Sequence, residues 1–113
     1  YIQRYTFYET KGFTDVTIPA QFKCIGEGAF SSSKTKSLTI EDGVEIIQSS
    51  AFSMNEELTR VDIADSVISI ERDAFLLCKA LEELKYDGKL KYIGKDAFSY
   101  TKVQDTLNKN QLP

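Results

Sequence analysis

A repeat of 22 or 23 residues constrains this chain more than any other feature of its sequence. Two columns define the repeat, one of isoleucine and one of phenylalanine five positions later. They are Ile2, Ile25, Ile47, Ile70 and Ile93, followed by Phe7, Phe30, Phe52, Phe75 and Phe98. Self-similarity at this period is typical of solenoids, in which neighbouring repeats bury each other's apolar face.

Each repeat opens with a short alternating run, which predicts a strand with one buried face. The runs are Phe13-x-x-Val16-x-Ile18, Thr35-x-x-Leu38-x-Ile40, Leu58-x-x-Val61-x-Ile63 and Leu81-x-x-Leu84-x-Tyr86. Turn signals follow at Pro19-Ala20, Asp42-Gly43, Asp65-Ser66 and Asp87-Gly88. The repeat therefore predicts a β-rich α/β solenoid, an arc of parallel short strands stacked about 4.8 Å apart.

An Ala-Phe dipeptide lies in the later part of each repeat, and the residue before its alanine is Gly28, Ser50, Asp73 or Asp96. These residue types cap helix N-termini, so we expect a short helical turn here, with the phenylalanine in the core. The first copy, "IGEGAF" at 25–30, is similar to a phosphate-binding loop. Acidic residues replace its glycines in other repeats, however, and a phosphate loop needs them for close backbone approach. We interpret the motif as the turn of the repeat.

The repeat divides the single domain, 1–113, into six segments. We expect a partial N-terminal repeat at 1–12, full repeats at 13–34, 35–57, 58–80 and 81–103, and a C-terminal end or cap at 104–113. Tyr1, Tyr5 and Tyr8 of the first segment either cap the open end of the core or form a surface where another repeat or domain docks. Because the chain starts with tyrosine, we expect a matured chain or a piece of a longer one.

The stretch "LTRVDIADSVISIERDAFLLCKAL" at 58–81 resembles the BspA-type leucine-rich repeat, with the pattern L-x-x-I-x-I-P-x-x-V-x-x-I-G-x-x-A-F-x-x-C-x-x-L. Ile18-Pro19 fits its I-P step, Ile93-Gly94 its I-G step, and Ala74-Phe75-x-x-Cys78 its A-F-x-x-C. The resemblance covers nearly the whole chain. It implies a leucine-rich-repeat arc from a bacterial cell-surface protein, with roles in adhesion to host matrix proteins and aggregation between cells.

The composition favours a protein without catalytic chemistry. There is no histidine, which is the usual base of nucleophilic catalysis and a common metal ligand. Cys24 and Cys78 lie at different phases of the repeat and about two coils apart, so we expect both thiols to be free and Cys78 to be buried. We expect no enzyme activity, no catalytic residue, no cofactor and no metal site.

Three aspartates form a column after the strands, at Asp42, Asp65 and Asp87. The interpretation we favour is that each aspartate bonds its own turn. A calcium site and a pair of catalytic acids are the alternatives, but the chain has no Asp-x-Asp-x-Asp-Gly loop.

The net charge is −3, and both signs are mixed along the chain. No Lys/Arg cluster is present to follow a phosphate backbone, and no apolar run approaches the roughly 18 residues that a membrane-spanning helix needs. We therefore expect neither nucleic-acid binding nor membrane insertion.

Polar residues alternate with the buried ones in each predicted strand, and these should form the concave face of the arc. One column reads Asp15, Ser37, Arg60, Glu83 and the next Thr17, Thr39, Asp62, Lys85. Opposite charges on neighbouring strands would then pair laterally, Arg60 with Glu83 and Asp62 with Lys85. Such residues either link the coils or contact a partner, with arginine the better anchor. The candidate partner-binding residues are Thr39, Arg60, Asp62, Glu83 and Lys85.

We expect a protein-interaction or adhesion module at the cell surface or outside the cell, whose partner is a protein, such as one of the extracellular matrix. One alternative is a structural spacer in a larger surface protein. Another is a carbohydrate-binding or enzyme accessory module, although no aromatic residue lies in the two exposed columns. The sequence does not settle the oligomeric state.

Overall fold

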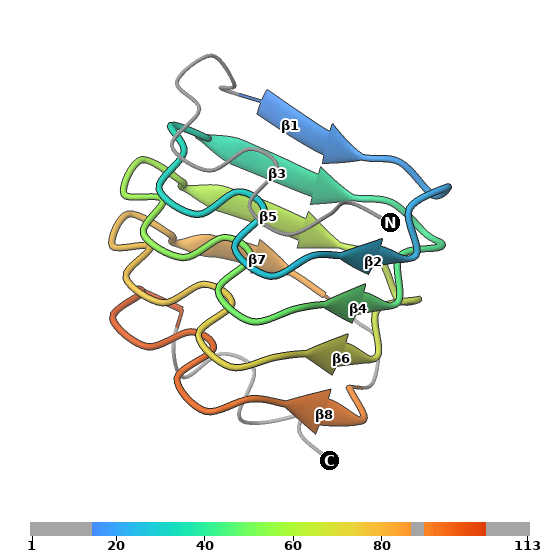
Figure 1. The fold of residues 1–113 in the computed structure, drawn as a ribbon. Coiled ribbons are helices and arrows are strands. Elements are labelled where there is room, and N and C mark those ends of the chain that lie inside the picture. The colour runs from blue at the N-terminus through green and yellow to red at the C-terminus, as the bar shows by residue number, and fades with distance from the viewer. Residues whose placement is uncertain (1–14, 87–89, 104–113) are drawn as a thin grey trace.

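The computed structural model describes residues 15–86 and 90–103, which form a solenoid of parallel strands (Figure 1). In this part of the chain one sheet contains β1 (Asp15–Ile18), β3 (Ser37–Ile40), β5 (Arg60–Ile63) and β7 (Glu83–Lys85). A second sheet contains the shorter strands β2 (Cys24–Ile25), β4 (Ile46–Ile47), β6 (Ser69–Ile70) and β8 (Tyr92–Ile93). Figure 1 shows the two sheets as two stacks of strands that run side by side along the solenoid. The predicted solenoid of parallel strands is confirmed.

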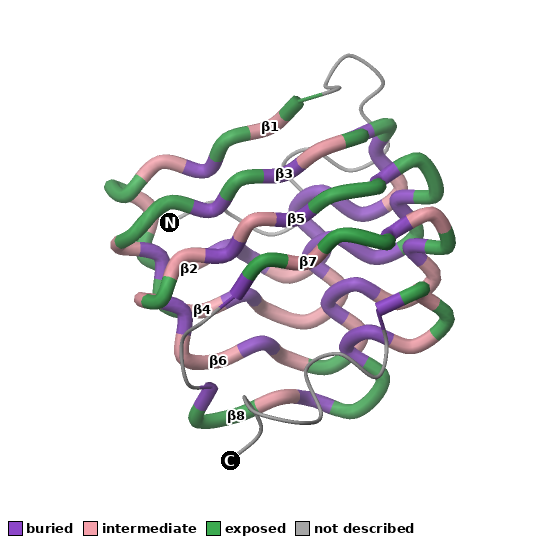
Figure 2. Tube along the Cα trace, turned by 180° about the vertical axis from the view of Figure 1, so that it is seen from behind, coloured by how far each residue is buried: buried purple, intermediate pink, exposed green. Residues whose placement is uncertain are grey.

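The register of the long strands reproduces the repeat of the sequence. Val16 lies opposite Leu38, Leu38 opposite Val61, and Val61 opposite Leu84. Equivalent residues of successive coils therefore stack directly on one another. Figure 2 shows the result, with buried positions recurring at the same place in each coil.

A column of phenylalanine rings runs through the core. Successive rings from Phe30 through Phe52 and Phe75 to Phe98 are stacked, with centroids 5.2, 5.2 and 5.0 Å apart. All four side chains are buried. The phenylalanine column seen in the sequence therefore joins the coils as one continuous apolar contact.

The Ala-Phe segment is a tight turn, and the prediction of a helical turn is wrong: no helix occurs among the described residues. The residue before each alanine is left-handed, with φ of 64° at Gly28, 58° at Ser50, 61° at Asp73 and 62° at Asp96. The N–H of Ala51 donates to the carbonyl of Gln48 at 3.2 Å, and the other three turns repeat this bond. A positive φ at the third residue is what a type II turn requires. Glycine, serine and aspartate therefore serve the turn by tolerating this conformation, as short side chains do.

The backbone of the Ala-Phe turns is also hydrogen-bonded between neighbouring coils. The N–H of Phe52 donates to the carbonyl of Ala74 at 2.8 Å, and the N–H of Phe75 donates to that of Ala97 at 2.7 Å. Each coil thus contacts the next through two sheets and this third row of bonds, which pairs buried backbone groups that lie outside the strands.

Candidate functional site

The exposed face of the long-strand sheet, here called the strand face, carries the side chains that the sequence assigns to partner contact. It consists of Asp15, Thr17, Ser37, Thr39, Arg60, Asp62, Glu83 and Lys85. These positions alternate with inward-facing ones along β1, β3, β5 and β7. The five candidate residues therefore share one surface, on which Asp62 is half-buried and the other four are exposed, namely Thr39, Arg60, Glu83 and Lys85.

The predicted neighbours on the strand face are confirmed, but the predicted ion pairs are not. Arg60 lies opposite Glu83, and Asp62 lies opposite Lys85. Arg60 nevertheless pairs along its own strand with Asp62, with Nη2 to Oδ2 at 3.0 Å and Nε to Oδ1 at 3.3 Å. Residues two apart on a strand project from the same face, so the planar guanidinium reaches both carboxylate oxygens. The expected ion pairs between Arg60 and Glu83 and between Asp62 and Lys85 are therefore wrong, although Ser37 Oγ does donate across coils to Asp15 Oδ1 at 2.6 Å.

The contact with Asp62 also shifts the pKa of Arg60. Its hydrogen bond to Asp62 raises the pKa of the guanidinium above its ordinary value, and the charges of Asp62 and Glu83 act in the same direction. Glu83 and Lys85 make no ion pair within 4.0 Å in the described part of the chain. They therefore present their charges to solvent.

Within the described residues, the ion pairs that join neighbouring coils lie away from the strand face. All of them are exposed, so each contributes only about 0–1 kcal/mol to stability. They are Lys23–Glu45 at 3.7 Å, Lys34–Glu57 at 3.6 Å, Lys79–Glu56 at 3.9 Å and Lys102–Glu82 at 3.8 Å.

A hollow of about 560 Å³ lies at the carboxyl ends of β3 and β5. Asp62 and Lys85 of the strand face line it and also line a second hollow of about 360 Å³ beside Arg60. The larger hollow is thus continuous with the strand face. The other described residues that line it are Ile40, Asp42, Ile63, Ala64 and Asp65.

The turns beside this hollow form where the aspartate column predicts them, but the aspartate side chains do not hold them. The N–H of Gly43 donates to Ser66 Oγ at 2.8 Å, and Ser66 Oγ donates to the carbonyl of Val44 at 2.7 Å. Asp42 and Asp65 accept no hydrogen bond and form no ion pair in the part of the chain described. At the turn after Asp42, a serine of the next coil thus makes the hydrogen bonds that were predicted for the aspartate. Asp87 lies outside the described residues.

Gly43, in the same turn, also lies against the coil before it. Its φ is +127°, and a Cβ at this position would lie 2.7 Å from the carbonyl oxygen of Ala20 in the coil before. Only glycine fits so close an approach without a shift of the backbone.

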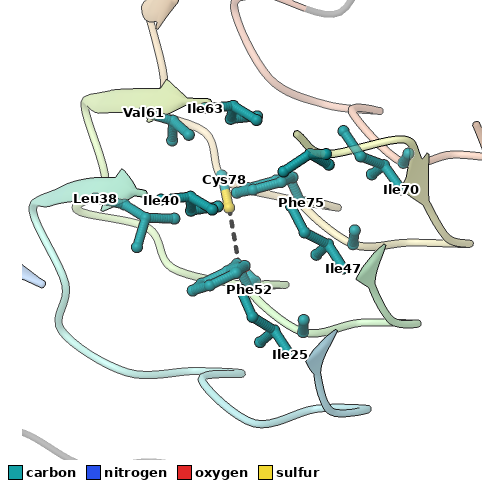
Figure 3. Packing of buried hydrophobic residues seen from close by; sticks show 14 of the residues in the cluster. Ile25, Leu38, Ile40, Ile47, Phe52, Val61, Ile63, Ile70, Phe75 and Cys78 are labelled. Atoms are coloured by element: carbon teal, nitrogen blue, oxygen red, sulfur yellow. Dashed lines mark hydrogen bonds between the residues drawn. The ribbon is translucent and has the colours of Figure 1, made fainter. Parts of the chain in front are cut away.

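A buried polar column, which the sequence analysis missed, lies beside the phenylalanine rings. Asn55 Nδ2 donates to the carbonyls of Phe30 at 2.9 Å and Phe52 at 2.8 Å. Cys78 Sγ donates to the same Phe52 carbonyl at 3.1 Å (Figure 3). The signal was present, because the third position after each phenylalanine holds a small hydrogen-bonding residue: Ser33, Asn55, Cys78 and Thr101. The column satisfies buried carbonyls and has a structural role.

Both cysteines are free and Cys78 is fully buried, as predicted. Burial raises the pKa of Cys78 to about 12. Partial burial raises the pKa of Cys24, and the charge of Glu71 adds to this. Neither thiol is therefore activated as a nucleophile, which would need a lowered pKa.

The structure gives no cluster of metal-binding type within 15–86 and 90–103, since no three Cys, Asp or Glu side chains converge there. A search of the same residues also finds no helix with the length and apolarity to cross a bilayer. Tyr1, Tyr5 and Tyr8 lie outside the described residues, so both interpretations of that segment stay predictions.

The family model for the BspA type leucine rich repeat region matches residues 1–112, in 6 copies. No curated protein matches the chain. Among solved structures, the crystal structure of the pneumococcal vaccine antigen PcpA is similar, with a TM-score of 0.72 and 29% sequence identity. The similarity covers 78% of this chain and 22% of that one, so the chain spans less than a quarter of the PcpA structure.

Proposed function

Because this chain belongs to the BspA-type leucine-rich repeat family, we propose that it is a non-enzymatic module that binds a protein partner through the strand face. The contacts would come from Thr39, Arg60, Asp62, Glu83 and Lys85. Binding would depend on a few anchors among these rather than on the total area buried.

The observation that carries this proposal is the absence of ion pairs between coils on the strand face in the described residues. Arg60 pairs within its own strand, and neither Glu83 nor Lys85 forms an ion pair with another described residue. If these charges served only to join the coils, they would pair across them, as Lys23 and Glu45 do elsewhere. Charges that form no ion pair between coils can contribute to contact with a partner.

Two further observations support the proposal. The solved structure similar to this chain is described as a vaccine antigen, a kind of protein that antibodies must reach, which favours a place at the cell surface or outside the cell. The chain also has no histidine and its two thiols have raised pKa values, which favours binding over catalysis.

The test is binding of the folded domain to a panel of extracellular matrix proteins, such as fibronectin and fibrinogen, by biolayer interferometry. We expect saturable binding to at least one of them that weakens as salt is raised, because charged anchors are screened. If a folded domain binds none of them, the structural-spacer function replaces the proposed one. The search for a binding site would then move to other parts of the parent protein.

A further inference from the structure

The turn after β3 contains the dipeptide Asp42-Gly43, in which the main chain can react with a side chain. The amide nitrogen of the residue after an aspartate can attack the carboxyl carbon of that aspartate. Glycine hinders this attack least, because it has no Cβ and its backbone adopts the widest range of conformations. Asp42 is the one aspartate of the described residues that precedes a glycine. The sequence therefore contains a candidate site of aspartate isomerisation at this turn.

The carboxyl group of Asp42 is not restrained by the fold. The side chain is exposed, and in the described part of the chain it accepts no hydrogen bond and forms no ion pair. A turn aspartate commonly accepts a hydrogen bond from the backbone of its own turn, but Asp42 does not. Any restraint on the reaction must therefore act on the amide of Gly43.

The amide of Gly43 is held by the next coil. Its N–H donates to Ser66 Oγ at 2.8 Å, and Ser66 Oγ donates in turn to the carbonyl of Val44 at 2.7 Å. The serine hydroxyl is thus fixed by two hydrogen bonds to the turn. Attack on Asp42 requires the Gly43 nitrogen to lose its proton and turn towards the carboxyl carbon, so the bond to Ser66 must break first.

The coil before the turn restrains the same glycine from the other side. A Cβ on Gly43 would lie 2.7 Å from the carbonyl oxygen of Ala20, so the two backbones are in close contact there. Gly43 therefore lies between the coil that contains Ala20 and the coil that contains Ser66. The main chain has little room to rearrange while both contacts are intact.

From these contacts we propose that Asp42-Gly43 is an isomerisation site that the stacking of the coils keeps closed, with Ser66 as the residue that holds it. The proposal does not depend on the proposed function. In the reaction, the Gly43 nitrogen forms a bond to Cγ of Asp42, and the amide proton leaves with the carboxyl hydroxyl as water. The product is a cyclic imide. Water then adds to one of its two carbonyl carbons and breaks the bond from that carbon to nitrogen.

The two directions of ring opening give different chains. Opening at Cγ restores aspartate, whereas opening at the main-chain carbonyl carbon gives isoaspartate, in which the main chain runs through the former side chain. One water leaves and one enters, so the mass is unchanged and no other reactant is needed. Isoaspartate adds one carbon to the main chain of a turn that is held on both sides. The isomerised protein should therefore have a lower midpoint of thermal unfolding than the original.

Peptide mapping of the whole chain provides the test. Tryptic peptide 37–60 contains Asp42 and no other aspartate, and chromatography separates its isoaspartate form from the aspartate form of equal mass. We expect conversion at Asp42 to be roughly tenfold or more slower in buffer than in urea, because the folded turn must open before it reacts. Asp87-Gly88 calibrates the unfolded chain, since in urea the two dipeptides should convert at similar rates. Equal rates at Asp42 in the folded and unfolded protein would overturn the proposal.

Variants identify the residue that holds the turn. In buffer, Ser66→Ala should accelerate conversion at Asp42 by roughly three- to tenfold, the factor expected from one lost hydrogen bond. Ser66→Thr keeps the hydroxyl and should retain the slow rate. Ser53→Ala is the control, because it removes a hydroxyl that bonds Ser31 of another coil at 2.9 Å, away from this turn.

Circular dichroism establishes that each variant folds. An unchanged rate in Ser66→Ala, or an equal acceleration in Ser53→Ala, would contradict the role of Ser66. The comparison of wild type in buffer and in urea needs no variant, so the proposal can fail even if Ser66→Ala does not fold.

Discussion

Phe52 and Phe75 lie one coil apart with their rings stacked, the centroids 5.2 Å apart and the planes 10° from parallel. Both side chains are 0% exposed. Their contact follows directly from the 23-residue step between them, because in-register coils bring equivalent side chains together. Each ring touches its counterparts in the coils on both sides, so loss of one ring affects two interfaces.

Phe75→Ala should therefore lower the free energy of unfolding by about 3–5 kcal/mol, the usual cost of a large cavity in a core. Phe75→Leu fills much of the same space and should cost less. Urea denaturation followed by circular dichroism measures both variants. A loss below about 1 kcal/mol for the alanine variant would show that the ring stack does not hold the coils together.

Asn55→Ala should cost about 1–3 kcal/mol for each buried carbonyl left without its side-chain donor. Asn55 Nδ2 donates to the carbonyls of Phe30 and Phe52, but only that of Phe30 loses its side-chain donor, because Cys78 Sγ still donates to that of Phe52. Asn55→Cys should cost less, because Cys78 already donates to a phenylalanine carbonyl from the equivalent position. Urea denaturation of the two variants gives the comparison. If the two variants are equally destabilised, the residues of this column stabilise the core by their volume and not by hydrogen bonding.

Ser50→Val should destabilise the protein by about 1–2 kcal/mol, since a β-branched residue is poorly tolerated in the left-handed conformation. Ser50 has a φ of 58°. Ser49→Val is the matched control, because Ser49 is also half-buried but is not left-handed. Thermal unfolding of both variants measures the difference. If the segment were a helical turn rather than a type II turn, Ser50→Val would lower the stability no more than Ser49→Val. That result would contradict the prediction.

Cys78 makes stability depend on pH in the alkaline range. Burial raises its pKa from an ordinary 9.0 to about 12 in the folded protein. Its contribution is complete below pH 9.0 and falls as the pH rises towards 12, because only the unfolded chain loses the proton in that range. The slope approaches 1.4 kcal/mol per pH unit, as a rough upper value.

Cys78→Ala removes this dependence and leaves the other titrating groups in place. We expect the stability difference between wild type and the alanine variant to shrink as the pH rises above 9.0, the ordinary pKa of the thiol. Urea denaturation at a series of pH values measures it. A difference that stays constant over this range would contradict the burial of the thiol.

The sequence predicted the backbone arrangement well because the repeat leaves few choices. Once Leu38 and Val61 occupy one column, in-register parallel strands follow, and the exposed columns of the strand face follow from their alternation. The choice between a helical turn and a left-handed turn was harder. Serine and aspartate suit both a helix cap and a positive φ, so residue type before the alanine could not distinguish them.

Side-chain contacts were the least predictable part of the site. The register places Arg60 beside Glu83, but it also leaves Asp62 within reach on the same strand, and side-chain conformation decides between them. The hollow was not predictable either. Its apolar lining residues were recognised as strand residues, but the space they leave depends on how the turns around Asp42 and Asp65 are closed.

The central claim is that a partner binds the strand face, and two charge reversals on opposite sides of the solenoid test it most directly. Arg60→Glu with Lys85→Glu alters the strand face, and Lys23→Glu with Lys91→Glu makes the same charge change beside the short strands. The measurement is biolayer interferometry of both folded variants against a matrix protein that the wild type binds. We predict that only the strand-face variant loses binding. Loss only in the short-strand variant, or equal loss in both, would contradict the claim.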